Sequence, residues 1–89
     1  MQTEKVCFIT GTTRDLDLHH CIHGPNRKKA DRDGLTVYLN HDVHMCLHAH
    51  QKPFSDLDAK LKKRAQKAYM EHYGATVEDF IREYGRSYL

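Results

Sequence analysis

The stretch LTVYLNHDVHMCLHAH, residues 35–50, is the part of the chain from which the fold is inferred first. Residues 35–39 are rich in β-branched and aromatic side chains, and this composition predicts a strand. Asn40 or Asp42 follows at the position of a helix cap, because either side chain can accept a hydrogen bond from a free amide at a helix start. We therefore expect a strand that passes directly into a short helix ending near His50.

Toward the N-terminus, two shorter extended segments are expected. Residues 5–10 (KVCFIT) and 16–22 (LDLHHCI) have the composition of strands, and the turn-forming sequences GTT and GPN follow them. The polar residues 27–33 are expected to form a loop or a helical turn, which Gly34 ends. The first half of the chain therefore predicts short strands and one helix.

Toward the C-terminus, two amphipathic helices are expected. Apolar residues recur at helical spacing over residues 57–69 and again over residues 77–84, and a glycine follows each segment. Ser55 and Thr76 each open a capping pattern in which an aspartate follows three residues later. Because these helices can cover a small sheet, we expect a single α+β domain that spans residues 1–89.

Histidine is the unusual feature of the composition. The chain of 89 residues contains 8 histidines, and all but His72 lie between His19 and His50. This concentration favours a functional site over a plain scaffold. The formal net charge of +2 is mildly basic, so it permits a nucleic-acid partner without requiring one.

Membrane, secreted and disulfide-rich classes do not fit this sequence. The longest fully apolar run, residues 6–9, is shorter than the roughly 20 residues of a membrane span or the about 7–15 of a signal-peptide core. The 3 cysteines form no CxxC pair and predict no disulfide framework. We therefore expect a cytoplasmic protein without a membrane partner.

Two pairs of histidines have spacings that suit a metal site. His44 and His48 lie four residues apart on the expected helix, so their side chains share one face and can converge on one ion. A third ligand from a strand would leave open positions, as in catalytic metal sites. His19 and His20 are adjacent on a strand and point to opposite faces, so one can bind a metal while the other acts as a base. Exposed histidines also occur at these spacings by chance, and His44 and His48 alone support a solvated helix face equally well.

The order of these motifs resembles the HNH, or His-Me finger, nucleases. Leu18-His19-His20, a strand and His44-x-x-x-His48 carry the resemblance, and the second half is similar to the metal-binding helix of the colicin-type DNases. The wider chain resembles small HNH proteins of phages and prophages. The segments that match those proteins are Cys7-Phe8-Ile9, Asn26-Arg27-Lys28-Lys29, the basic helix at Leu61-Lys62 and the closing sequence YGRSYL.

The resemblance implies a ββα-metal core in residues 1–52 and a helical part in residues 53–89. It implies a metal-dependent endonuclease that hydrolyses phosphodiester bonds in DNA, encoded by a bacterium or a phage. His20 would be the general base, and a divalent ion (Mg²⁺, Mn²⁺, Ni²⁺ or Zn²⁺) would neutralise the scissile phosphate. The other implied roles are metal ligands at His19, His44 and His48, and contacts with DNA phosphates at Arg27, Lys28 and Lys29.

DNA is therefore the expected partner. Contacts with phosphates carry no sequence information and weaken with salt, so the binding is expected to be mostly independent of sequence. A homodimer that cuts both strands is compatible with a chain of 89 residues.

The sequence departs from the family pattern at the cysteines. Many relatives bind a second, structural zinc through two pairs of cysteines, whereas here Thr10, Asn40 and Val43 occupy three of those positions. Because the lone Cys7 cannot make such a site, we predict no structural zinc.

The asparagine that orients the base in the family also lacks a clear counterpart. It is expected near residues 33–35, which contain none, so Asn26 and Asn40 are the remaining candidates. Two alternatives follow from these departures: a catalytically decayed nucleic-acid-binding module, and a small interaction protein stapled by zinc. His23 and His50 have no assigned role at this stage.

Overall fold

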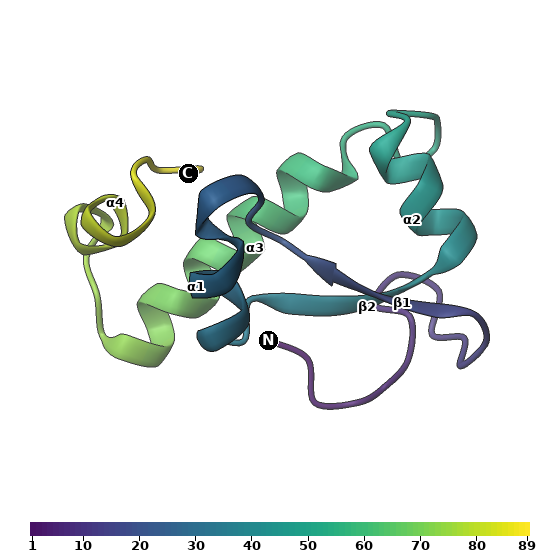
Figure 1. The fold of residues 1–89 in the computed structure, drawn as a ribbon, viewed down its shortest axis with the longest axis horizontal. Helices are drawn as coiled ribbons and strands as arrows, with labels where there is room; N and C mark the ends of the chain where they lie inside the picture. The colour runs from purple at the N-terminus through teal and green to yellow at the C-terminus, as the bar shows by residue number, and fades with distance from the viewer.

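Two antiparallel strands form the sheet of this protein. The computed structural model describes residues 1–89, and in it β1 (Leu16–His20) pairs with β2 (Thr36–Asn40) (Figure 1). In the register of this pair, His19 lies opposite Val37. The side chains of β2 alternate between buried and half-buried, as expected for a strand with one face on a core. With four α-helices around this sheet, the expected α+β class is confirmed.

The connection between the strands contains a short helical segment. The 3-10 turn η1 (Gly24–Asn26) leads into α1 (Arg27–Arg32), so the polar residues after the first strand take the helical alternative. Gly34 then has a φ of 69°, a left-handed conformation that favours glycine. The amide of Cys21 donates to the carbonyl of Leu35 at 3.1 Å, which closes the connection beside the sheet.

The helix α2 (His41–His48) begins directly after β2, as the sequence predicts. The Asn40 side chain caps it by accepting a hydrogen bond from the amide of Asp42 at 3.0 Å. This cap fixes the angle at which the helix leaves the strand, and α2 packs against both strands.

The two C-terminal helices are α3 (Leu57–Tyr73) and α4 (Val77–Tyr84). Thr76 and Asp79 form the predicted capping box, in which each side chain bonds the backbone amide of the other residue. The cap predicted at Ser55 is wrong, because Asp56 occupies the N-cap position of α3. The Asp56 carboxylate bonds no helix amide and pairs with Lys60 at 3.1 Å instead.

The strand predicted over residues 5–10 is also wrong. This segment folds back on itself in turns, with the amide of Cys7 bonded to the carbonyl of Thr12 at 2.8 Å. A single backbone bond, from Phe8 to the carbonyl of Tyr38, joins it to the edge of β2. Cys7 is buried in the core and Phe8 packs against it, so these two apolar residues serve the core without a place in the sheet.

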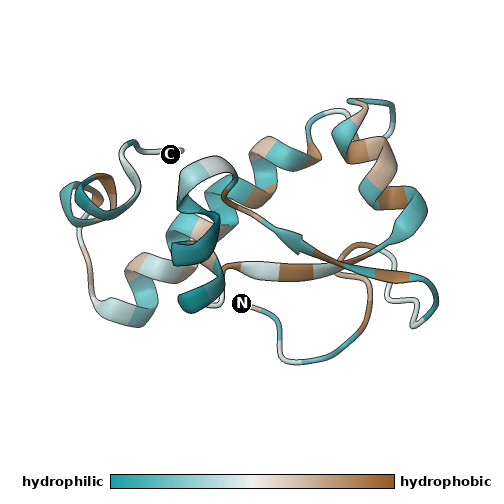
Figure 2. Ribbon diagram, in the orientation of Figure 1, coloured by the Kyte–Doolittle hydropathy of each residue, from teal (hydrophilic) through white to brown (hydrophobic).

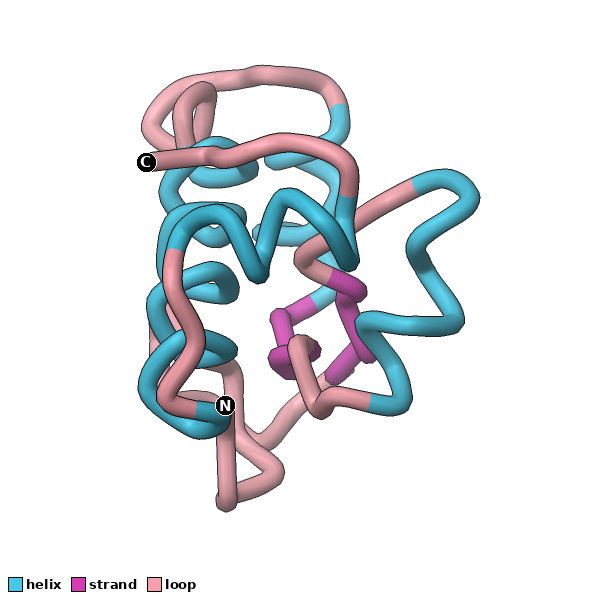
Figure 3. The backbone as a smooth tube through the Cα atoms, turned by 90° about the vertical axis from the view of Figure 1, so that its left-hand side faces the viewer, coloured by secondary structure: helices cyan, strands magenta, loops and turns pink.

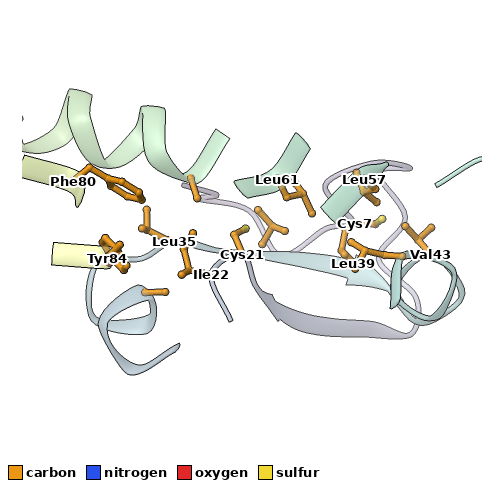
Figure 4. Packing of buried hydrophobic residues seen from close by; sticks show 14 residues of the cluster. Cys7, Cys21, Ile22, Leu35, Leu39, Val43, Leu57, Leu61, Phe80 and Tyr84 are labelled. Carbon is orange, nitrogen blue, oxygen red and sulfur yellow. The ribbon is translucent and has the colours of Figure 1, made fainter. Parts of the chain in front are cut away.

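The core runs along the long axis of the molecule. Figure 4 shows its labelled side chains in a row from Phe80 and Tyr84 at one end to Val43 at the other. Figure 3 shows the short strands between helical segments, and Figure 2 shows apolar residues interspersed with polar ones along β2 and α3. Phe80 is fully buried, and truncation of such a side chain to alanine typically costs about 3–5 kcal/mol of stability. None of the helices combines the length and the apolar character that a membrane crossing requires.

Candidate metal centre

The centre of the site is His19, which is 2% exposed on the inner face of β1. Its Nε2 atom is buried and has no hydrogen-bond partner in the protein. A buried polar atom without a partner typically costs about 1–3 kcal/mol, so such an atom points to a ligand that the protein itself does not supply.

His44 and His48 face His19 from α2. Their Nε2 atoms lie 3.0 Å apart, and the centroid of the His19 ring lies 5.2 Å from that of His44 and 5.8 Å from that of His48. One ligand nitrogen from each residue falls within 4.8 Å of the others. Any two nitrogen ligands of a tetrahedral zinc site are about 3.3 Å apart, given Zn–N bonds of about 2.0–2.1 Å. The structure thus gathers the three predicted ligands in an arrangement that could hold a metal ion.

The surroundings keep two of these rings neutral. Burial, followed by the neighbouring His44, lowers the pKa of His19 to about 4. Burial and the same neighbour also lower the pKa of His48. Only a neutral imidazole has a lone pair to offer a metal, so at neutral pH both side chains are in the form that binds.

Asp17 contacts the His44 ring at Nδ1, the nitrogen that does not face His48. Its Oδ2 atom lies 3.1 Å from Nδ1 of His44 and 2.7 Å from Nδ1 of His41. These hydrogen bonds, from His44 first and then from His41, lower the pKa of Asp17, and the bond to Asp17 raises the pKa of His41. Sequence reasoning missed Asp17, although its position two residues before His19 places it on the same face of the strand.

A second group that could hold a metal contains His19, His23 and Asp58, again with ligand atoms within 4.8 Å of one another. Nε2 of His23 lies 2.7 Å from Oδ1 of Asp58, the second residue of α3. The sequence carried no signal for this contact, because the two residues are 35 positions apart and belong to different elements.

His20 points to the other face of β1, as adjacent strand residues must. Its Nε2 atom lies 3.4 Å from a carboxylate oxygen of Asp31 in α1. Both histidines of the doublet line one open pocket of about 280 Å³. The complete lining consists of Leu18, His19, His20, His23, Gly24, Arg27, His44 and His48.

Larger hollows lie elsewhere, beside Met1 and α3, with volumes of about 350 and 460 Å³. Neither is lined by one of the groups that could hold a metal. The chemistry of the side chains, and not the size of the hollow, therefore selects the histidine pocket as the candidate site.

The three basic residues predicted to contact phosphates separate in the structure. Arg27 lines the pocket, and Lys28 is exposed without a hydrogen bond or ion pair. Lys29 points elsewhere, because its Nζ atom donates to the carbonyl of Glu83 at 2.9 Å and ties α1 to the end of α4. Lys29 thus makes a structural contact, and the role predicted for it at a DNA phosphate stays a prediction.

Neither asparagine orients His20. The side chain of Asn40 caps α2 and donates to the carbonyl of Arg14, while that of Asn26 donates to the carbonyl of Tyr84 at 2.9 Å. The structure thus places both side-chain amides at loops and helix ends and not against His20. Asp31 is the side chain that contacts the His20 ring.

The cysteines belong to neither group that could hold a metal. Cys7 and Cys21 are buried in the core as free thiols, and Cys46 is half-buried on α2. The Cys7 sulfur accepts a hydrogen bond from the amide of Thr10 at 3.4 Å.

Comparison with known proteins found no match for this chain among protein-family models, curated proteins or solved structures.

Proposed function

We propose that this chain is a metal-dependent endonuclease that hydrolyses phosphodiester bonds in DNA. The observation that carries the proposal is the buried, unpartnered Nε2 of His19, which faces His44 and His48, with His20 among the residues that line the adjoining pocket. Strand β1, strand β2 and helix α2 follow one another in the order of a ββα-metal module. This order supports the resemblance of residues 1–52 to the HNH nucleases.

The three imidazoles fit a divalent metal. His19, His44 and His48 offer three nitrogen ligands, one of them an otherwise orphaned buried atom, and the open pocket leaves room for further ligands. A divalent ion bound there supplies Lewis-acid stabilisation of the negative charge that develops on the phosphate. Asp17 keeps His44 oriented through Nδ1 and so leaves Nε2 of that ring for the ion.

His20 acts as the general base in this proposal. Because Nε2 of the ring faces the Asp31 carboxylate, Nδ1 is the atom that accepts a proton from the attacking water. The negative charge of Asp31 stabilises the imidazolium that results. Arg27, at the rim of the same pocket, binds a phosphate of the DNA backbone through its guanidinium fork.

Plasmid nicking tests the proposal. The wild-type protein is expected to nick supercoiled DNA with at least one of Mg²⁺, Mn²⁺, Ni²⁺ and Zn²⁺. His20→Ala is expected to abolish nicking while calorimetry shows nearly unchanged metal affinity, because His20 is not among the ligands. His72→Ala, at an exposed histidine of α3, is the matched control and keeps full activity. Nicking that survives His20→Ala at the wild-type rate would falsify the mechanism.

A nucleic-acid-binding module without catalysis is the second candidate. It is favoured by the engagement of Asn26 and Asn40 in structural contacts away from His20. Such a module would retard DNA in a salt-dependent manner and leave it uncut with every metal. A protein stapled by zinc would instead lose thermal stability with a chelator and show no affinity for DNA.

A further inference from the structure

We propose that His19, His23 and Asp58 form a second position for a divalent metal ion, which shares His19 with the first position. One ion therefore occupies either the first position with His44 and His48, or the second with His23 and Asp58. The evidence for the second position is the arrangement of its own three residues and does not depend on the proposed function. The exclusion between the two positions rests on the metal site of the proposed function.

The geometry of the second position comes from three separate parts of the chain. His19 belongs to β1, His23 to the loop after it, and Asp58 to the first turn of α3. The rings of His19 and His23 are edge-to-face with centroids 5.3 Å apart, and a carboxylate oxygen of Asp58 lies 2.7 Å from Nε2 of His23. The unpartnered buried nitrogen of His19 completes the group.

Asp58 is suited to act as a ligand. Its side chain is 19% exposed, and Lys62 binds its other carboxylate oxygen at 3.0 Å. Two imidazoles and one carboxylate form a ligand set that zinc and manganese accept.

The shared residue makes the two positions exclusive. A neutral imidazole has one lone pair, and the buried Nε2 of His19 has no partner in the protein. Two ions at once would require both ring nitrogens of His19 as donors, and therefore loss of the ring proton in a buried setting. The chain is thus expected to bind one ion in total.

The two positions differ in what they connect. An ion in the first position lies between β1 and α2, whose ligands line the pocket together with His20. An ion in the second position ties the end of β1 to α3 through Asp58 and leaves His44 and His48 free. The two positions therefore place the ion against different helices, α2 in the first and α3 in the second.

Metal titrations of variants test the second position directly. In calorimetry with Zn²⁺ and Mn²⁺, the wild-type protein is expected to bind one ion. His44→Gln/His48→Gln, which removes the first position, is expected to keep one ion. Addition of Asp58→Asn to that variant should weaken the remaining binding by more than about 100-fold, since loss of a ligand exceeds the roughly 10–100-fold effect of an outer partner.

Asp56→Asn provides the matched control. Asp56 pairs with Lys60 one turn along α3 just as Asp58 pairs with Lys62, but it lies in neither metal group. It should leave binding in the His44→Gln/His48→Gln background unchanged. Circular dichroism of each variant confirms that the fold is retained, and visible absorption of bound Co²⁺ reports the change of ligand set independently of affinity.

Failure of this inference is distinguishable from failure of the proposed function. If His44→Gln/His48→Gln folds but binds no ion, His23 and Asp58 form an ion pair only, and the second position is wrong. The first position is tested separately by His23→Ala/Asp58→Asn, which should still bind one ion and nick DNA. Binding of two ions by the wild-type protein would overturn the exclusion and leave both positions in place.

Discussion

The carboxylate of Asp17 lies 3.1 Å from Nδ1 of His44, and this contact decides which nitrogen of His44 faces the metal centre. Because the carboxylate can only accept, Nδ1 carries the hydrogen and donates it. Nε2 then points away from Asp17 toward His48, which it approaches to 3.0 Å. A carboxylate behind a metal-binding imidazole is the usual means of fixing the ring orientation.

Asp17→Asn is expected to weaken metal binding. The variant keeps the size of the side chain but removes the negative charge that holds the Nδ1–H of His44. Loss of such an outer partner typically lowers metal affinity by about 10–100-fold. Calorimetric titration with Zn²⁺ measures the effect. Asp15→Asn, at a neighbouring exposed residue whose side chain makes no hydrogen bond or ion pair, is the control, and equal losses in the two variants would refute the positioning role of Asp17.

Asp31→Asn is expected to slow cleavage without changing metal affinity. The Asp31 carboxylate lies 3.4 Å from His20 and stabilises that ring when it takes up a proton. A general base contributes about 10²–10⁴-fold to rate, so loss of its partner should lower kcat by at least about tenfold and leave KM nearly unchanged. Plasmid nicking under saturating and limiting DNA separates the two constants. Partial recovery by Asp31→Glu would support the electrostatic role, and an unchanged kcat in Asp31→Asn would exclude it.

Substitutions of Arg27 and Lys29 are expected to have different effects on DNA binding, although both residues were predicted to contact phosphates. Arg27 lines the pocket, so Arg27→Ala should weaken DNA binding and lower the slope of log affinity against log salt by about 1. Lys29 is bonded to the carbonyl of Glu83, so Lys29→Ala should leave that slope unchanged. Fluorescence anisotropy at several salt concentrations measures both slopes, and equal slopes in the two variants would contradict the assignment.

Lys29→Ala should instead reduce stability. Removal of its hydrogen bond to the end of α4 is expected to lower the free energy of unfolding by about 1 kcal/mol. Denaturant unfolding of Lys29→Ala and Arg27→Ala gives the comparison. The loss should be confined to Lys29→Ala, since the exposed side chain of Arg27 makes no hydrogen bond or ion pair within the protein.

Acid should destabilise the fold through Asp33, which belongs to neither group that could hold a metal. The side chain of Asp33 is 3% exposed, and it accepts hydrogen bonds from Tyr84 at 2.6 Å and from Tyr73 at 2.9 Å. Burial would raise the pKa of Asp33, but bonds from Arg32 and the two tyrosines outweigh burial and lower it. The folded protein therefore keeps the charge where the unfolded chain is already protonated. Stability from this group is full above about pH 4 and is lost as the pH falls through the folded pKa.

Thermal unfolding from pH 7 to pH 2 measures this loss. Asp33→Asn should be less stable than the wild-type protein at pH 7, and the difference should shrink toward pH 2. Tyr84→Phe, which removes one donor to the carboxylate, should lower the free energy of unfolding at pH 7 by about 1.5–3 kcal/mol. A pH dependence that is the same in Asp33→Asn and the wild-type protein would show that other groups dominate.

The sequence predicted best those features that depend on neighbouring residues. Thr76 and Asp79 form the expected capping box, and Asn40, one of the two expected candidates, caps α2, because a cap depends only on the residues that follow it within one turn. The two failures, a strand at residues 5–10 and a cap at Ser55, have one cause. Apolar and capping residues also serve other purposes, here burial in the core and an ordinary turn, which local patterns do not distinguish.

The contacts between distant segments were not predictable in the same way. Asp31 reaches His20 because α1 folds back beside β1, and Asp58 reaches His23 across 35 residues of sequence. Lys29 is basic like Arg27 and lies two residues further along the chain, yet it contacts α4. Such outcomes depend on how the helices pack on the sheet, for which no short pattern exists.

The sequence by itself determined that His44 and His48 share one helix face, because the four-residue spacing fixes this in any α-helix. It also determined that His19 and His20 point to opposite faces of a strand. Only the tertiary structure decided that His19 is the buried member of that doublet and that its Nε2 has no partner. The physical reason is that the burial of a side chain and the lack of a partner for its polar atom depend on the surrounding elements. For His19 these elements are β1, α2 and α3, which pack around the same point.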